Sequence, residues 1–285
     1  TTPAIAYLLE RGIALVFLNS HGQLRGRLVG AAARNLELRH RQYRCAEDPA
    51  FCLAVSRAIV RGKLENYGVL TRRMRRGRDD QCAAAVAEIE KQMTAAPGAL
   101  DLDSLRGIEG AGTKAYFDVL RGGLQHELGF VKRVRRPPTD PVNALLSLGY
   151  TLLGENLFAA LEIVGLDPYD GFYHADKYGR PALALDLIEE FRGVIVDSLV
   201  RQVINREIIG AGDFQKASGT EHGVFLNRNG LRKFFHHYNA RLNTRVQHPV
   251  YRKKWTYLEC FEVQARLMRK TIEGELAAYV PFRTK

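Results

Sequence analysis

The 285-residue chain has few of the features that mark secreted, zinc-bound or membrane proteins. It has only four cysteines, Cys45, Cys52, Cys82 and Cys260, and they form no CxxC pair and no zinc-like spacing. This excludes the common zinc-finger patterns and favours reduced cysteines in a cytosolic protein. No apolar run approaches the ~20 residues that a transmembrane helix needs, and the first residues do not resemble a signal peptide. We therefore expect a cytoplasmic protein that does not enter a membrane.

Acidic residues are also scarce relative to basic ones. The chain has 42 lysines and arginines against 31 aspartates and glutamates, a formal net charge of +11. Such an excess says little about the fold, but it indicates a polyanionic partner, and nucleic acid is the polyanion that we expect. The alternative is a generally basic protein without such a partner. The basic runs at 72–78 (RRMRRGR) and 131–136 (VKRVRR) are either phosphate contacts or simply solvated charges.

Residues 1–30 differ in pattern from the rest of the chain. Ala4–Glu10 predicts a short amphipathic helix, and the β-type runs Ile13–Leu18 and Gln23–Val29 predict two strands. Two short strands do not form a stable sheet alone. We therefore expect residues 1–30 to be the end of a β-domain whose other strands precede this sequence or come from another chain. The start at Thr1 rather than methionine fits a fragment, a processed product or part of a longer polypeptide.

From residue 31 onward, apolar residues recur with the period of a helix. Asp48-Pro49 and Asp140-Pro141 are typical helix starts, and Val142–Val164 is apolar enough to be the buried centre of a helical domain. We expect the glycines at 110–112 to loosen the helix around them, and the last helix to run from about Tyr251 to Tyr279. The prediction is a mainly α fold, in which residues 31–285 form an all-helical domain.

The stretch Gly171–Arg192, GFYHADKYGRPALALDLIEEFR, carries the residues best suited to chemistry. His174 ends an aromatic run, and Asp186 and Glu189 lie three residues apart on one face of a leucine-rich helix. Ionised carboxylates among leucines are costly unless a cation compensates them. A histidine and two carboxylates without a thiolate favour magnesium or manganese, and such ions serve phosphodiester chemistry. Each residue also has an ordinary interpretation: His174 as surface or core filler, Asp186 as an arginine partner, and Glu189 as a solvated acid.

Several linked segments resemble one known family. The segments LRGIEG (105–110), GFYHADKYGRP (171–181) and LALDLIEEFR (183–192) have the order and spacing of the CRISPR-associated integrase and endonuclease of spacer acquisition. PVNALLSLGYTLL (141–153) and ALEIVGLDPYDGF (160–172) are similar to the same family. The resemblance covers nearly the whole chain. It implies an N-terminal β-domain, of which residues 1–30 would be the end, and an all-α catalytic domain at 31–285.

The resemblance also implies a catalytic site. Glu109, His174 and Glu189 would hold Mg²⁺ or Mn²⁺, and Asp186 would be a second essential acid that orients a water or holds His174. The implied reaction inserts new spacers into a CRISPR array, as part of antiviral defence in a prokaryotic cytoplasm. The 3′-hydroxyl of a captured DNA fragment would attack the phosphodiester at the leader–repeat boundary, and with water as nucleophile the site would be a nuclease.

The implied partners are double-stranded DNA (the spacer precursor and the repeat), a second copy of the chain and a small CRISPR adaptation protein. A fused or associated iron–sulfur nuclease is a further candidate partner. The C-terminal VPFRTK tail is a candidate contact for the small partner. The candidate DNA contacts are the basic residues in and around the motifs, namely Lys177, Arg180, Arg192, Arg135, Arg136, Arg252, Lys253 and Lys254.

Two other classes of function remain open from the residues. One is a non-catalytic nucleic-acid scaffold, in which the acids are partners of buried ion pairs. The other is a metal-dependent nuclease for branched repair DNA, which would cut without joining.

Overall fold

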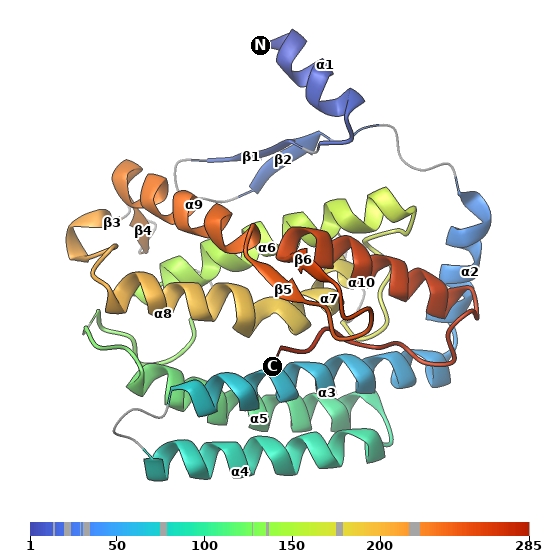
Figure 1. The fold of residues 1–285 in the computed structure, drawn as a ribbon, viewed down its shortest axis with the longest axis horizontal. Coiled ribbons are helices and arrows are strands. Elements are labelled where there is room, and N and C mark those ends of the chain that lie inside the picture. The colour runs from blue at the N-terminus through green and yellow to red at the C-terminus, as the bar shows by residue number, and fades with distance from the viewer. Residues whose placement is uncertain are drawn as a thin grey trace.

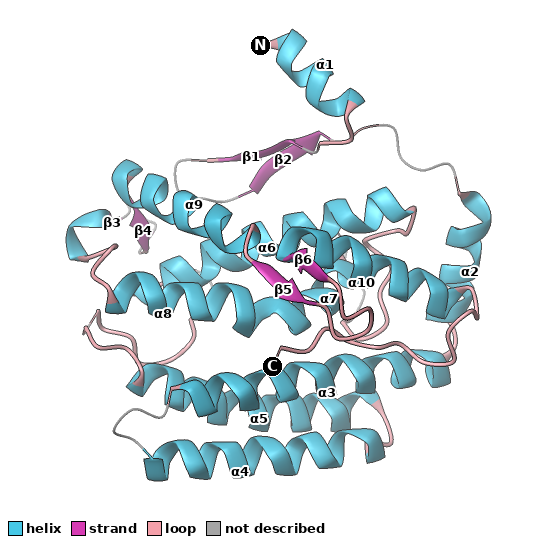
Figure 2. Cartoon of the chain, viewed as in Figure 1, coloured by secondary structure: helices cyan, strands magenta, loops and turns pink. Residues whose placement is uncertain are grey.

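The computed structural model describes residues 1–13, 15–19, 24–28, 30, 35–74, 79–126, 128–134, 137–174, 179–216 and 223–284. The α-helices are α1 (Thr2–Glu10), α2 (Leu36–Ala46), α3 (Pro49–Arg73), α4 (Asp79–Ala95), α5 (Leu102–Gly122), α6 (Pro141–Val164), α7 (Ala182–Phe191), α8 (Ser198–Asn205), α9 (Arg228–Leu242) and α10 (Tyr257–Ile272). The strands form antiparallel hairpins from β1 (Leu15–Leu18) and β2 (Leu24–Leu28), β3 (Phe214–Lys216) and β4 (Val224–Leu226), and β5 (Arg245–Gln247) and β6 (Lys254–Thr256). The prediction of a mainly α fold is confirmed (Figure 2).

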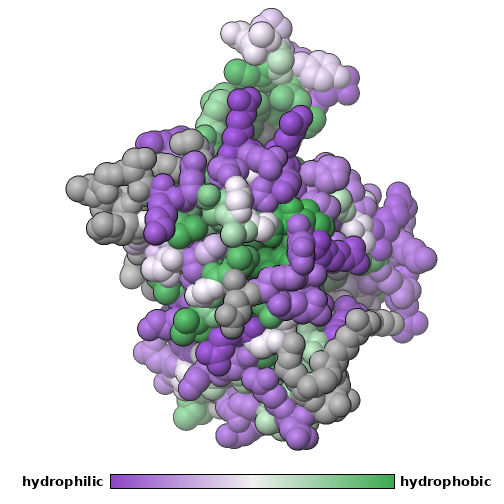
Figure 3. Space-filling view, turned by 90° about the vertical axis from the view of Figure 1, so that its left-hand side faces the viewer, coloured by the Kyte–Doolittle hydropathy of each residue, from purple (hydrophilic) through white to green (hydrophobic). Residues whose placement is uncertain are grey.

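The N-terminal helix and hairpin project from the helical body (Figure 1). Strands β1 and β2 lie within the two predicted β-type runs, and they pair antiparallel with Leu15 opposite Leu28. Arg27 of β2 ties the hairpin to α6, because its guanidinium lies 3.0 Å from the Glu155 carboxylate and 3.5 Å from the Phe158 ring centre. Figure 3 shows apolar residues gathered on this projection, and Phe17 there is 46% exposed. The domain boundary at residue 30 and the additional strands stay predictions.

Helix α6 is the buried central helix that the sequence predicted. The Asp140 side chain accepts a hydrogen bond from the Asn143 backbone at its start, and Pro141 occupies the first turn. By length and composition alone, this helix could cross a membrane, with a mean hydropathy of 1.3 over its most apolar window. The expectation that no apolar run is long enough to span a membrane is therefore wrong for α6. Since 61% of that window is buried inside the fold, packing explains its apolar character.

Helices α3, α4 and α5 pack against one another as a three-helix bundle, and α7 lies between α3 of this bundle and α6 (Figure 1). Helix α7 contacts both α3 and α6, so its residues are covered on two sides. A short π-helix, η2 (Arg192–Asp197), joins α7 to α8. The site therefore lies at a junction of helices that are far apart in the sequence.

Two expectations about helix boundaries are wrong. Helix α5 runs without interruption through Gly110 and Gly112, because its neighbours α3 and α4 pack against it. The last helix begins at Tyr257 rather than near Tyr251, since the residues before it form the β5–β6 hairpin and Thr256 caps the helix. That hairpin and β3–β4 are additions to a domain that the sequence predicted as entirely helical.

Candidate active site

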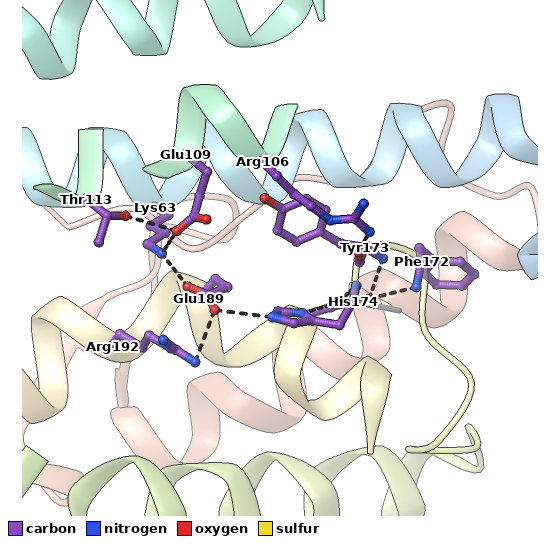
Figure 4. Close-up of polar contacts among 10 residues, drawn as sticks. Lys63, Arg106, Glu109, Thr113, Phe172, Tyr173, His174, Glu189 and Arg192 are labelled. Carbon is purple, nitrogen blue, oxygen red and sulfur yellow. Dashed lines mark hydrogen bonds and ion pairs between the residues drawn. The ribbon is translucent and has the colours of Figure 1, made fainter. Parts of the chain in front are cut away.

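The candidate site lies where α3, α5, α7 and the segment before α7 meet (Figure 4). Glu109 comes from α5, His174 from the segment, and Asp186 and Glu189 from α7. The structure brings His174 into contact with both acids of α7. Glu109 is joined to Glu189 through the ammonium of Lys63. The predicted residues thus gather in one place, although they span 80 positions of the chain between Glu109 and Glu189.

Asp186 organises the segment before α7. Its fully buried carboxylate accepts hydrogen bonds from the backbone of Phe172, Tyr173 and His174, at 2.7, 3.0 and 2.9 Å. Its Oδ1 also lies 2.7 Å from the Nδ1 of the His174 ring. Because all of these contacts point toward the loop, Asp186 is suited to holding His174 rather than to binding a metal directly.

The contact with Asp186 determines which nitrogen of His174 is free. A carboxylate only accepts hydrogen bonds, so Nδ1 carries the ring proton and Nε2 carries the lone pair. Nε2 lies 3.7 Å from Oε1 of Glu189. The ring is therefore oriented with its basic nitrogen toward the second acid.

Gly171 allows the loop to pass close to α7. A Cβ atom at this position would lie 2.7 Å from the backbone carbon of Ala182 and from the backbone nitrogen of Leu183. On the opposite side, the guanidinium of Arg106 in α5 donates to the Tyr173 carbonyl at 3.1 Å. The loop that carries His174 is thus held by helices on both sides.

Glu189 is an ionised acid in a buried position. Burial by itself would raise the pKa of its carboxyl, but the charges of Arg192 and Lys63 outweigh this effect and lower the pKa to about 2. The Arg192 guanidinium lies 3.2 Å from Oε1, and the Lys63 ammonium lies 2.6 Å from Oε2. The Glu189 carboxylate therefore keeps its negative charge at neutral pH.

Lys63 was missed by the sequence analysis. Its side chain is 2% exposed and contacts both Glu109 and Glu189. Glu109 also accepts a hydrogen bond from the Thr113 hydroxyl at 2.9 Å. One signal in the sequence could have revealed Lys63. It lies four residues from Ile59 and from Tyr67, both buried, so a lysine occupies the core-facing side of α3.

The candidate DNA contacts are scattered in the structure. Arg192 lies at the site, where its guanidinium stacks 4.9 Å from the Tyr150 ring centre. Arg180 is half-buried in the turn before α7. The basic residues at the β5–β6 hairpin are exposed, namely Arg252, Lys253 and Lys254. Three of the predicted contacts, Lys177, Arg135 and Arg136, lie outside the described residues.

The donor set suits a divalent cation. Two ligands bound to one ion at about 2.1 Å each lie roughly 3–4 Å apart, and the 3.7 Å between His174 Nε2 and Glu189 Oε1 falls in this range. Within the part of the chain that the structure describes, no three such side chains already surround one point. Glu109 is separated from the other two donors by the Lys63 ammonium, so binding all three would require Lys63 to move.

Solved structures share this fold. A casposase bound to integration product matches with a TM-score of 0.85 and 22% identity, over 98% of this chain and 77% of that one. A CAS1 protein from Thermotoga maritima matches with a TM-score of 0.80 and 22% identity, over 100% and 85%. At 22% identity, these two matches establish a shared fold and nothing further. A Cas6-RT-Cas1–Cas2 complex matches at 25% identity with a TM-score of 0.86, over 100% of this chain and 31% of that one.

Curated proteins are similar in sequence. A CRISPR-associated exonuclease Cas4/endonuclease Cas1 fusion from Geobacter sulfurreducens is 40% identical over 100% of this chain and 52% of its own length. A similar fusion from Rhodospirillum rubrum is 38% identical over 98% and 49%, so the chain spans about half the length of these fusions. CRISPR-associated endonuclease Cas1 3 from Thermus thermophilus is 36% identical over 100% and 83%. The family described as CRISPR associated protein Cas1 matches residues 1–240, and this chain belongs to that family.

Proposed function

We propose that the chain is the DNA integrase and endonuclease of CRISPR spacer acquisition, with Mg²⁺ or Mn²⁺ held by Glu109, His174 and Glu189. The observation that carries the proposal is the pairing of a buried, ionised Glu189 with a histidine whose other nitrogen is held by Asp186. The endonuclease names of the Cas1 relatives support nuclease activity. The fold shared with a casposase bound to integration product supports the joining of DNA strands.

The proposed reaction is a transesterification. A bond forms between the 3′-oxygen of the incoming DNA and a phosphorus at the leader–repeat boundary, and the bond from that phosphorus to its former 3′-oxygen breaks. One phosphodiester replaces another, so no external energy source is needed. A bound divalent ion would activate the attacking hydroxyl and neutralise charge that develops on the phosphorus.

The side chains of this chain have distinct tasks in the proposed reaction. Asp186 keeps the His174 ring in one orientation, which is the usual role of a carboxylate behind a metal-binding histidine. Arg192 and Lys63 balance the charge of Glu189 and supply positive charge near the reacting phosphate. Because Arg106 and Asp186 hold the loop from two sides, His174 is already in position before DNA binds.

The proposed partners follow from the relatives. The complex that contains Cas1 and Cas2 supports a small adaptation protein as partner of this chain. The fusions that contain the exonuclease Cas4 support a fused or associated nuclease, for which the sequence resemblance implied an iron–sulfur type. A homodimer and double-stranded DNA as substrate are part of the same proposal.

An integration assay tests the proposal. A labelled DNA fragment with free 3′-hydroxyls is incubated with a repeat-containing plasmid, the small partner and Mg²⁺, and then with Mn²⁺. The expected result is labelled plasmid for the wild type, and none for His174→Ala. His236→Ala, on the exposed face of α9, serves as the control and should retain activity.

The same assay separates the other two classes of function. Cutting without joining, even with the small partner present, would favour a nuclease for branched repair DNA. DNA binding by wild type and His174→Ala alike, with neither cutting nor joining, would favour a non-catalytic scaffold.

A further inference from the structure

Lys63 is a charged residue in a position where charge is unusual. Among the described residues, it is the only lysine or arginine that is fully buried. Ile59 and Tyr67, one helical turn away on either side, are also buried, and the Tyr67 ring lies 5.5 Å from the Lys63 ammonium. A buried ammonium is costly unless anions compensate it, and two carboxylates do so here.

The two carboxylates come from different helices. Glu109 of α5 and Glu189 of α7 each turn one oxygen toward the Lys63 ammonium (Figure 4). The other oxygen of Glu189 faces His174 and Arg192. Without a cation between them, the two acids would repel each other, so Lys63 holds α5 and α7 together at this point.

We propose that Lys63 is a built-in counter-cation of the site, which holds Glu109 and Glu189 together and competes with a divalent ion for their oxygens. The inference rests on the proposed metal site. The Lys63 ammonium lies between Glu109 and Glu189, so a metal ion that binds both acids displaces the lysine head group. The flexible four-carbon stem of lysine permits this movement. Lys63 thus lowers the metal affinity of the site while it keeps Glu109 and Glu189 close together.

Metal-binding measurements test the competition directly. After removal of metal by a chelator, Mn²⁺ affinity is measured by electron paramagnetic resonance for wild type and for Lys63→Met, which keeps an unbranched side chain one atom shorter and without charge. We expect Lys63→Met to bind Mn²⁺ at least tenfold more tightly. An unchanged or weaker affinity would overturn the proposal, since Lys63 would then not compete with the ion.

Lys233→Met is the matched control. The Lys233 ammonium also pairs with a buried acid, Asp213, at 2.8 Å, but on α9 rather than at the site. We expect this variant to leave Mn²⁺ affinity unchanged. Glu189→Gln distinguishes the proposed metal site from the proposed role of Lys63. If it leaves Mn²⁺ affinity unchanged, the metal site itself is wrong. If it abolishes binding while Lys63→Met has no effect, only the counter-cation is wrong.

A second measurement uses the wild type in case Lys63→Met does not fold. The ammonium of Lys63 is followed by nuclear magnetic resonance in protein labelled with ¹⁵N-lysine, and its signal is assigned by its disappearance in Lys63→Arg. Addition of Mg²⁺ is expected to shift or broaden this signal with the same midpoint as metal binding, while the Lys233 signal stays unchanged. A Lys63 signal that does not respond at saturating Mg²⁺ would contradict displacement.

Discussion

Asp186 illustrates how one buried carboxylate orders a loop and a ring together. Its two oxygens accept from three successive backbone nitrogens and from His174, so this one side chain fixes both the backbone of the segment and the ring of His174. The sequence pattern had grouped Asp186 with Glu189 as a pair of acids on one face. The structure separates their tasks, because Asp186 faces the loop and Glu189 faces the cations.

Asp186→Asn should weaken metal binding without removing a ligand. An amide donates as well as accepts, so it no longer fixes the proton on Nδ1 of His174. We expect Mn²⁺ affinity and strand transfer to fall about 10–100-fold. Asp213→Asn is the control, since it alters another buried acid that accepts from Lys233. Wild-type Mn²⁺ affinity in Asp186→Asn would contradict the positioning role.

Asp197, at the end of the π-helix, should make stability depend on pH. Burial raises the pKa of its carboxyl from 3.8 to about 6, although the Tyr150 hydroxyl and Arg192 oppose this shift. The folded state thus binds the proton more tightly than the unfolded state. The stabilisation is complete below about pH 3.8 and is lost as the pH rises through 6.

Urea unfolding of wild type and Asp197→Asn between about pH 4.5 and 7.5 tests this expectation. Relative to the variant, the wild type should lose about 2 kcal/mol of unfolding free energy across that range, because the amide does not titrate. A difference between the two proteins that stays constant with pH would assign the titration to other groups.

At the scale of the element, α5 shows why glycines occur around Glu109. A Cβ at Gly112 would lie 2.3 Å from the Cδ2 atom of Leu64, which is fully buried in α3 beside Lys63. A Cβ at Gly110 would meet no heavy atom within 4 Å. Gly112 therefore permits the close approach of α5 to α3 that brings Glu109 to Lys63, and Gly110 does not contribute to it.

Substitution of the two glycines should have opposite effects. Gly112→Ala is expected to lower the free energy of unfolding by about 1–3 kcal/mol through overpacking, and to weaken Mn²⁺ binding by moving Glu109. Gly110→Ala should raise the free energy of unfolding by about 0.5–1 kcal/mol, because alanine is the better helix former. Chemical denaturation measures both. Equal effects of the two substitutions would mean that close packing of α5 against α3 does not require a glycine at position 112.

The C-terminal segment forms part of the core rather than a free tail. Phe282 is 1% exposed, and its backbone nitrogen donates to Glu190 at 2.6 Å. The hydroxyl of Tyr279 donates to the same carboxylate at 2.6 Å. The apolar part of the VPFRTK segment is thus packed inside this chain, and only its polar residues remain as a candidate contact for the small partner.

Two neighbouring residues of this segment should differ sharply in their effect. Phe282→Ala removes a buried ring and is expected to cost about 3–5 kcal/mol of unfolding free energy. Arg283→Ala removes a partly exposed ion pair with Glu65 at 3.2 Å, and it should cost less than about 1 kcal/mol. Thermal or chemical unfolding measures both. Similar, small losses would mean that the segment is not anchored in the core.

At the scale of the whole molecule, the net charge of +11 should make the proposed DNA binding sensitive to salt. Two exposed lysines of the β5–β6 hairpin, Lys253 and Lys254, are suited to phosphate contacts. By contrast, Arg41 and Arg44 of α2 share Glu37 as an ion-pair partner, at 3.0 and 3.7 Å. The two pairs carry the same charge, but Glu37 compensates part of the charge of the arginine pair.

Fluorescence anisotropy of a labelled duplex between about 50 and 200 mM salt compares the two pairs. Replacing Lys253 and Lys254 by alanine should reduce the slope of log affinity against log salt by about 1–2, because each lysine that binds a phosphate accounts for about one unit of the slope. Replacing Arg41 and Arg44 should reduce the slope less, because Glu37 already compensates part of their charge. A slope that falls equally in both variants would indicate a general effect of net charge.

Local sequence determined much of this protein. Asp48-Pro49 and Asp140-Pro141 begin helices because a side-chain oxygen and a proline act within one turn. Asp186 and Glu189 share a face of α7 because helical spacing alone brings residues three apart together. The resemblance to a family then added Glu109, which no local pattern would have marked.

Only the tertiary structure decided how these residues act together. Lys63 reaches Glu109 and Glu189 through the packing of α3 against α5 and α7, and contacts between distant segments leave no periodic trace in the sequence. The same packing turned Asp186 toward the His174 loop and surrounded Glu189 with cations. Spacing along a helix determines which side chains share a face, whereas the charge and burial of that face depend on which helix lies opposite.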